Sequence, residues 1–155
     1  IYCKNNCYRD KFMDLKGWDD LHKAAVLNEV DNAKALIENG AEVDKGDAQD
    51  FTPLHWGAGY NSLEVVKLLL ETGADVNNRD KDSRTPLHWA ARYNSLEVTK
   101  LLLENGADVN RQNKHGDTPL HWATHYNSAE VAKVLREFDD DKDKADGKNG
   151  TNGQD

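Results

Sequence analysis

The apolar positions of this chain recur in blocks of 33 residues, most clearly from Thr52 onward. In each block a short segment has apolar residues four apart, as at Leu54 and Ala58, and a second segment, Leu63–Glu71, has an almost continuous apolar face. Such spacing predicts amphipathic helices. The polar, turn-rich segment Ala74–Arg84 predicts a connecting loop. We therefore expect pairs of short antiparallel helices joined by hairpin-like loops.

The tetrapeptide Thr-Pro-Leu-His marks the repeat at three places, beginning at Thr52, Thr85 and Thr118. The blocks that begin at Thr52 and Thr85 are identical at 23 of 33 positions. A period of this length is typical of a solenoid, in which each unit buries its apolar side only by stacking on its neighbours. A fourth unit lies upstream, where Leu21 is in register with the later leucines and Asp19 replaces the threonine.

Polar residues at fixed places bound the predicted helices. Thr52 is an N-cap residue whose hydroxyl accepts a backbone N–H, and proline follows it at the first helical position. Asn61 tolerates the left-handed conformation that ends a helix, and Ser62 is then expected to cap the second helix. Gly73 ends that helix because glycine adopts positive φ freely. The counterparts one repeat later are Thr85, Asn94, Ser95 and Gly106.

The repeats are expected to span residues 14–139, in the units 14–46, 47–79, 80–112 and 113–139. Polar replacements at Asn32 and Arg136, in the first and last units, are typical of capping repeats, so we expect a complete array. Residues 1–13 fit no repeat register and form an extension that either packs on the first unit or is disordered. The start at Ile1 leaves open that the chain is a fragment. Residues 140–155 are expected to form a disordered acidic tail, because they lack apolar side chains that could offset the entropy of ordering.

The formal net charge of -8, with a pI near 5.2, argues against nucleic acid and against an anionic membrane surface as partners. No apolar run approaches the roughly 20 residues of a membrane helix, and no signal peptide is visible. Cys3 and Cys7 are the only cysteines and form no disulfide framework, so we interpret them as reduced thiols. These features favour an intracellular monomer.

Two consecutive patterns carry a resemblance to a known family. The first is Asp-x-x-Gly-x-Thr-Pro-Leu-His-x-Ala-Ala, and the second is Leu-Glu-Val-Val-Lys-Leu-Leu-Leu-Glu-x-Gly-Ala-Asp-Val-Asn. Together they resemble the ankyrin repeat, over about four fifths of the chain from Asp14 to near Asp139. The resemblance implies an all-α, ankyrin-type helical solenoid of four helix-turn-helix repeats joined by β-hairpin-like loops. It also implies non-enzymatic binding of protein partners through loop tips and first helices. Asp50 and Ser83 depart from the family pattern, because they occupy the loop position that is usually glycine.

Four histidines occupy one position of the repeat, next to the N-cap: His22, His55, His88 and His121. A residue needed once in every unit is expected to be structural, and the resemblance implies that its imidazole bonds the loop backbone and the capping residue. No cysteine or carboxylate is arranged with His115 or His125 as metal ligands or catalytic partners. No phosphate-binding loop or nucleophile motif is present. We therefore predict no catalytic residues, no metal and no cofactor.

The aromatic residues of the first helices are the strongest candidates for binding. Trp56 lies about 200° around the helix from Leu54, and Tyr60 shares its stripe four residues later. The same pairing recurs as Trp89 with Tyr93 and Trp122 with Tyr126, which predicts two parallel columns on the inner face. Trp and Tyr are enriched among binding hot spots. The alternative is that the rings only stack to strengthen the contacts between repeats.

The near-identical repeats differ mainly at positions that the resemblance places on the partner-binding face. One position holds Phe51, Arg84 and Asp117, another holds Gly59, Arg92 and His125, and the loop tips hold Ala48-Gln49, Lys81-Asp82 and Lys114-His115. Such variation fits a recognition surface, although unconstrained exposed positions would vary in the same way. The predicted partner-binding residues are Phe51, Trp56, Tyr60, Lys81, Asp82, Arg84, Trp89, Arg92, Tyr93, Lys114, His115, Asp117, Trp122, His125 and Tyr126.

The favoured function is a non-catalytic module that binds a folded protein or a peptide through the concave face and the loop tips. One alternative is a regulatory or targeting segment of a larger enzyme. Another is a secreted effector that mimics host ankyrin scaffolds. The resemblance also marks Asn77 and Asn110 as candidate sites for the asparaginyl hydroxylase that modifies this family in animals.

Overall fold

The computed structural model describes residues 19–147, while residues 1–18, which include the predicted extension, and residues 148–155 lie outside the described part. Within the described range the regular structure is entirely helical. The helices are α2 (Asp20–Leu27), α3 (Val30–Glu38), α4 (Pro53–Gly59), α5 (Leu63–Glu71), α6 (Pro86–Arg92), α7 (Leu96–Glu104), α8 (Pro119–His125) and α9 (Ala129–Gly147).

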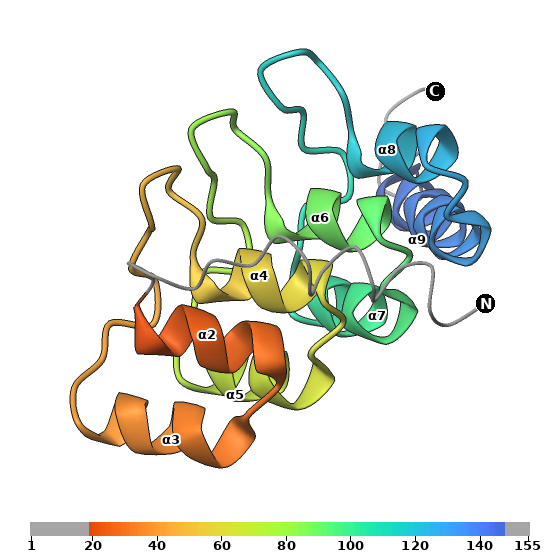
Figure 1. The fold of residues 1–155 in the computed structure, drawn as a ribbon. Helices are drawn as coiled ribbons and strands as arrows, with labels where there is room; N and C mark the ends of the chain where they lie inside the picture. The colour runs from red at the N-terminus through yellow and green to blue at the C-terminus, as the bar shows by residue number, and fades with distance from the viewer. Residues whose placement is uncertain (1–18, 148–155) are drawn as a thin grey trace.

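The helices pair into hairpins that stand side by side, and the long loops between hairpins project to one side of the array (Figure 1). α2, α4, α6 and α8 pack on one another in sequence order and form one layer. α3, α5, α7 and α9 form a second layer in the same order. This arrangement is the all-α repeat solenoid that the 33-residue period predicts.

The core is a stripe that runs through all four hairpins. Its largest members recur at equivalent positions and are at most 1% exposed; they include Leu21, Leu54 and Leu87 of the first helices and Leu69, Leu102 and Leu135 of the second helices. Each hairpin covers only part of these side chains by itself, and its neighbours cover the rest. Burial at about 25 cal/mol per Å² of apolar surface is the main stabilising term, and in a solenoid the contacts between neighbouring repeats contribute to it.

Thr52 and His55 cap α4 reciprocally, and the pair recurs in the later repeats. The Thr52 side chain accepts the His55 backbone N–H, and His55 Nδ1 accepts the Thr52 backbone N–H at 3.1 Å. Because Nδ1 accepts, the proton of the neutral ring is on Nε2, which donates to the Arg84 carbonyl oxygen at 3.0 Å. The structural role predicted for the four histidines is confirmed for His55 and His88, whose Nε2 bonds join one repeat to the next. His22 makes the same kind of bond to the Phe51 carbonyl oxygen, but its Nδ1 has no partner among the described residues. His121 of the last repeat keeps the bond to its cap residue.

The expectation that serine side chains cap the second helices is wrong. Ser62 occupies the N-cap position of α5 but its side chain makes no capping hydrogen bond. The cap comes from the preceding repeat, where Asn28 Oδ1 accepts the Val65 N–H at 3.2 Å. Asn28 adopts a φ of 55°, as expected for a helix-ending asparagine. Its side-chain amide lies next to the first turn of α5, which belongs to the following hairpin. The pattern recurs from Asn61 to Val98 and from Asn94 to Val131.

The loops keep one geometry despite the missing glycines. Asp50 and Ser83 have φ of 62° and 61°, in the region where Gly116 has 81°. The side chain of Asp80 accepts the backbone N–H groups of Asp82 and Arg84 at 2.8 and 3.0 Å, which holds the turn around Ser83. These bonds offset the cost of positive φ at a non-glycine residue.

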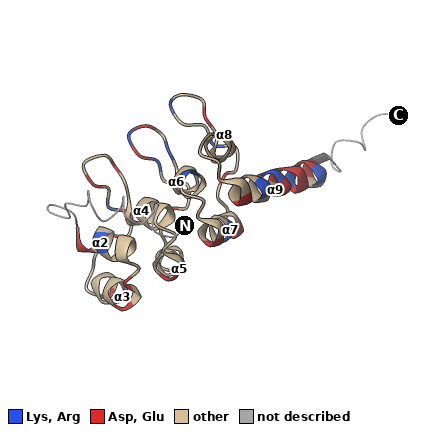
Figure 2. Cartoon of the chain, turned by 45° about the vertical axis from the view of Figure 1, so that its right-hand side comes forward, with Lys and Arg blue, Asp and Glu red and all other residues tan. Residues whose placement is uncertain are grey.

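The predicted disorder of residues 140–155 is wrong for their first half, because α9 continues to Gly147. The second helix of the last repeat is already nucleated on the core, so each further residue adds a helical bond without a new nucleation cost. Lys133 pairs with Glu137 at 3.9 Å and Lys144 with Asp141 at 3.7 Å along this helix. Figure 2 shows the charged extension projecting beyond the other hairpins.

Candidate protein-binding surface

Every predicted partner-binding residue lies on α4, α6 and α8 or on the loops before and immediately after them (Figure 1). We call the part of this surface formed by α4, α6, α8 and the residues next to their ends the inner face, and we describe the loop tips separately. Leu54 and Ala58 of α4 are fully buried, whereas Trp56, about half a turn away, is only partly buried. The period of the helix therefore aims the tryptophan away from the core, as predicted.

The three Trp–Tyr pairs form as expected, with ring centroids 6.0 to 6.4 Å apart. The tyrosines are the more open partners: Tyr93 and Tyr126 are 39% and 40% exposed. The tryptophans are half-buried, and Trp122 packs against the hydrophobic core. The tryptophans therefore pack between repeats while the tyrosines present an exposed aromatic surface, and the binding role of these rings stays a prediction.

The tryptophans do not form one simple column. Trp89 and Trp122 meet edge to face at 5.6 Å, but Phe51 lies against both Trp56 and Trp89, at 5.3 and 5.2 Å. Phe51 comes from the loop before α4. The second and third repeats are thus joined on the inner face through a loop side chain.

The ion pair between Arg84 and Asp80 distinguishes the third repeat from the second, where the equivalent aspartate is Asp47. In the second repeat the Trp56 indole N–H donates to Asp47 Oδ2 at 3.0 Å. In the third repeat Arg84 Nε holds Oδ2 of the equivalent Asp80 at 2.7 Å. The Trp89 indole N–H is buried and has no acceptor among the described residues. Phe51 occupies the position equivalent to Arg84. This one difference between the loops explains why the Trp56 indole N–H has a carboxylate acceptor and the Trp89 indole N–H has none among the described residues.

Arg92 of α6 is a second arginine among aromatic rings. Its guanidinium carbon lies 5.5 Å from the ring of Trp89, 5.4 Å from Tyr93 and 4.8 Å from Tyr126. These are cation–π distances. Unlike Arg84, it has no carboxylate within ion-pair distance in the part of the chain that the structure describes.

A hollow of about 260 Å³ opens between the second and third repeats on the inner face. Gly59 leaves room in its wall, because the equivalent positions of the later repeats carry Arg92 and His125. Among the described residues, a Cβ atom built on Gly59 would meet the Tyr93 ring, at 3.5 Å or more. The hollow is lined by Phe51, His55, Trp56, Gly59, Tyr60, Trp89, Arg92 and Tyr93.

The buried capping histidines of the second and third repeats are neutral, and His55 is one of the residues that line the hollow. Burial lowers the pKa of His55 to about 4, against the opposing effect of its bond to the Arg84 carbonyl. Burial likewise lowers the pKa of His88, whose Nε2 bonds the Asp117 carbonyl oxygen at 2.9 Å. Each ring nitrogen of His55 already has a backbone partner, so this imidazole has no free lone pair for acid–base chemistry.

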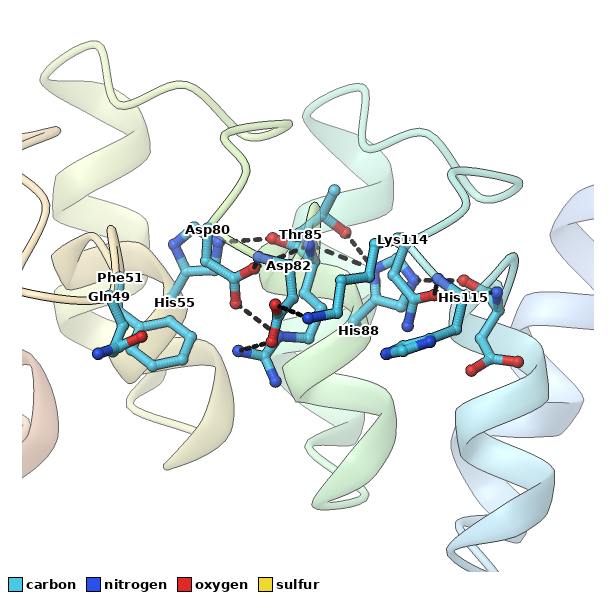
Figure 3. Close-up of polar contacts among 12 residues, drawn as sticks. Gln49, Phe51, His55, Asp80, Asp82, Thr85, His88, Lys114 and His115 are labelled. Atoms are coloured by element: carbon cyan, nitrogen blue, oxygen red, sulfur yellow. Dashed lines mark hydrogen bonds and ion pairs between the residues drawn. The ribbon is translucent and has the colours of Figure 1, made fainter.

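The loop tips form a separate polar ridge (Figure 3). The Lys81 N–H donates to the Gln49 carbonyl oxygen at 3.1 Å, and the Lys114 N–H donates to the Asp82 carbonyl oxygen at 2.9 Å, which links consecutive tips. The Lys114 ammonium also contacts the Asp82 carboxylate, and this hydrogen bond lowers the pKa of Asp82. Asp82 in addition accepts an ion pair from Arg84 at 3.2 Å.

The structure therefore divides the predicted residues among three places: the hollow, the loops before α6 and α8, which include Arg84 and Asp117, and α8 with its cap. Six of them line the hollow: Phe51, Trp56, Tyr60, Trp89, Arg92 and Tyr93. The loop-tip residues lie on the ridge, and Trp122, His125 and Tyr126 lie on α8 or its cap. Gly59 and His55 were not predicted as lining residues. The signal for Gly59 was present in the sequence, since the smallest residue occupies a position held elsewhere by arginine and histidine.

The two candidate hydroxylation sites have different surroundings. The Asn77 amide donates to the Gly106 carbonyl oxygen at 3.2 Å and accepts the Asp108 N–H at 2.8 Å, so it joins two repeats. Asn110 is exposed and donates to Asp139 at 2.8 Å. Hydroxylation of either residue stays a prediction.

Over residues 19–147 we found no group of three or more His, Cys, Asp or Glu side chains placed to hold a metal ion. No helix in the same range has the length and apolar content needed to cross a membrane.

Comparison with known proteins agrees with the repeat geometry. The family profile described as "Ankyrin repeats (3 copies)" matches residues 2–80 and, in a second overlapping match, residues 73–146. No curated protein matches the chain. Ankyrin repeats are generally protein–protein interaction modules and are typically non-catalytic. With hairpins, loops and core all repeating in register, the chain belongs to the ankyrin repeat family.

Proposed function

We propose that this chain is a non-catalytic module that binds a folded protein or a peptide through the inner face and the loop tips. The observation that carries the proposal is the aromatic hollow between the second and third repeats, where Tyr93 is 39% exposed beside the half-buried Trp89. Exposed aromatic surface is more typical of an interaction site than of a solvated face. The proposal includes a monomeric protein inside the cell, with neither nucleic acid nor membrane as its partner.

Tyr93→Ala tests the proposal, with Leu27→Ala as its control. The two side chains are 39% and 51% exposed, but only Tyr93 lines the hollow. A displayed peptide library selected on the unmodified full chain supplies the ligands, and their dissociation constants are measured by titration calorimetry. We expect Tyr93→Ala to weaken binding at least tenfold, in the range of hot-spot truncations, and Leu27→Ala to change it less than threefold. Equal effects of the two variants, or selected ligands insensitive to both, would contradict the role of the hollow.

A further inference from the structure

The walls of the hollow fit an aromatic side chain. Phe51 and Trp89 meet edge to face at 5.2 Å, and the stacked pair of Trp89 and Tyr93 has an interplanar angle of 15°. Trp56 and Tyr60 line the same hollow from α4 and its cap. A dry cavity of about 150 Å³ is large enough for a benzene ring, and the hollow measures about 260 Å³. One aromatic side chain of a partner therefore fits, with edge-to-face contacts available to it.

The charge beside the hollow selects among ligands. Aromatic walls alone are typical of sites for quaternary or methylated ammonium groups. Here Arg92 lines the same hollow, and its positive charge repels such a guest. The guanidinium is already positioned by three aromatic rings, so little entropy is lost when it forms a new bond.

The nearby carboxylates do not neutralise Arg92. Asp47 accepts the Trp56 indole N–H, while Asp80 and Asp82 pair with Arg84. In the part of the chain that the structure describes, no carboxylate lies within 4.0 Å of the Arg92 guanidinium. An arginine that keeps its N–H donors available is suited to a carboxylate supplied by a partner.

The net charge of -8 does not oppose this choice, because part of it lies on other surfaces and the loop carboxylates Asp47, Asp80 and Asp82 already have partners. Exposed glutamates begin the second helices at Glu64, Glu97 and Glu130. The charged extension of α9 also projects away from the inner face (Figure 2). At physiological ionic strength, exposed charges farther apart than about 8 Å are largely screened.

We propose that the hollow takes an aromatic side chain of a linear peptide segment that carries an Asp or Glu next to that side chain, and that Arg92 binds this carboxylate. The inference rests on the proposed function and names the chemistry of the partner. Complementary charge sets it apart from a purely apolar or a basic ligand.

The test uses the full chain and short peptides with Gly/Ser flanks around a Phe-Glu, Phe-Gln, Phe-Lys or Ala-Glu pair. Binding is followed by NMR titration of the indole N–H signals. We expect Phe-Glu to bind about five- to tenfold tighter than Phe-Gln, and Phe-Lys and Ala-Glu to bind weakest. Arg92→Gln should remove the preference for Phe-Glu over Phe-Gln, whereas Arg136→Gln, the same charge change on an exposed residue of α9, should leave it intact.

Gly59→Arg provides a second variant, because it installs the residue that the third repeat carries at this position and fills the hollow. Its Cβ is in ordinary van der Waals contact with the Tyr93 ring among residues 19–147, so the fold should persist, and circular dichroism checks this. We expect all Phe-containing peptides to lose binding. Equal affinity for Phe-Glu and Phe-Lys would overturn the inference, as would cross-links that place residues 1–18 of the chain itself in the hollow and persist at saturating peptide. If selected ligands of other chemistry still depend on Tyr93, the proposed function survives and only this inference fails.

Discussion

The second and third repeats share 23 of 33 residues, yet they treat their tryptophans differently. Trp56 donates its indole N–H to Asp47, whereas the indole N–H of Trp89 is buried with no acceptor among the described residues. The cause is the loop position that holds Phe51 in one repeat and Arg84 in the other. The residues that the two repeats share determine their helices, loops and core. A few loop and helix positions that differ determine the surface that each repeat presents.

The largest predicted effect tests whether equivalent core residues of the second and third repeats contribute equally to the free energy of unfolding. Leu69 and Leu102 occupy the same position in α5 and α7, and both are fully buried. We expect Leu69→Ala and Leu102→Ala each to lower the free energy of unfolding by about 2–5 kcal/mol, because each leaves a cavity in the stripe. Urea denaturation measures both variants, and Leu27→Ala, at a residue 51% exposed, serves as the control with a smaller loss. A loss below about 1 kcal/mol in only one of the two repeats would break the equivalence.

The second prediction concerns acid and the two capping histidines. Burial lowers the pKa of His55 to about 4 and also lowers that of His88. An unfolded histidine takes up its proton near pH 6.5, so between there and pH 4 the unfolded state binds more protons than the folded state. The contribution of these two neutral histidines to the free energy of unfolding is therefore fully present above pH 6.5, and it is lost as the pH drops toward 4.

The size of this loss follows from the shift. At about 1.4 kcal/mol per pKa unit, His55 alone contributes roughly 3 kcal/mol. Urea denaturation at a series of pH values measures the slope. We expect His55→Gln to reduce the slope and the exposed control His125→Gln to preserve it. Stability that stays constant from pH 7 to pH 4.5 would contradict the buried neutral state.

The smallest predicted effect concerns the residue that distinguishes the two repeats. Arg84→Phe copies the second repeat into the third and frees Asp80 to accept the Trp89 indole N–H. The two lost ion pairs, with Asp80 and Asp82, and the gained hydrogen bond are each worth about 1 kcal/mol, so we expect a net loss of stability of about 1 kcal/mol. Hydrogen exchange of the Trp89 indole, followed by NMR, should become as slow as that of Trp56. If exchange at Trp89 does not slow, Arg84 is not what separates the two repeats.

Most of the fold was predictable because the same pattern of cap, apolar and turn residues occurs three times in the sequence. The helix starts at Thr52, Thr85 and Thr118, the left-handed asparagines and the structural histidines all follow from local chemistry that a single block displays. The serine caps were mispredicted because a local rule was applied to a contact that lies between repeats. The extension of α9 was missed because composition alone underestimates a helix that is already nucleated on a core.

The site was only partly predictable. The sequence places Trp56, Tyr60, Trp89 and Tyr93 on one stripe, and helical geometry is enough for that. It does not show that Phe51 inserts between two tryptophans, or that Gly59 opens a hollow against the next repeat. Both features depend on residues brought together from consecutive repeats, about 30 positions apart in the chain.

By itself, the sequence determined the solenoid, its period and the helix faces, because these depend on spacings of a few residues repeated in register. The tertiary structure decided which carboxylate each arginine holds, which indole lacks an acceptor and where the inner face is hollow. The physical reason is one of range. Helix and cap preferences act within a turn or two of the chain, whereas packing and ion pairing on the inner face depend on distances that exist only after neighbouring hairpins have stacked.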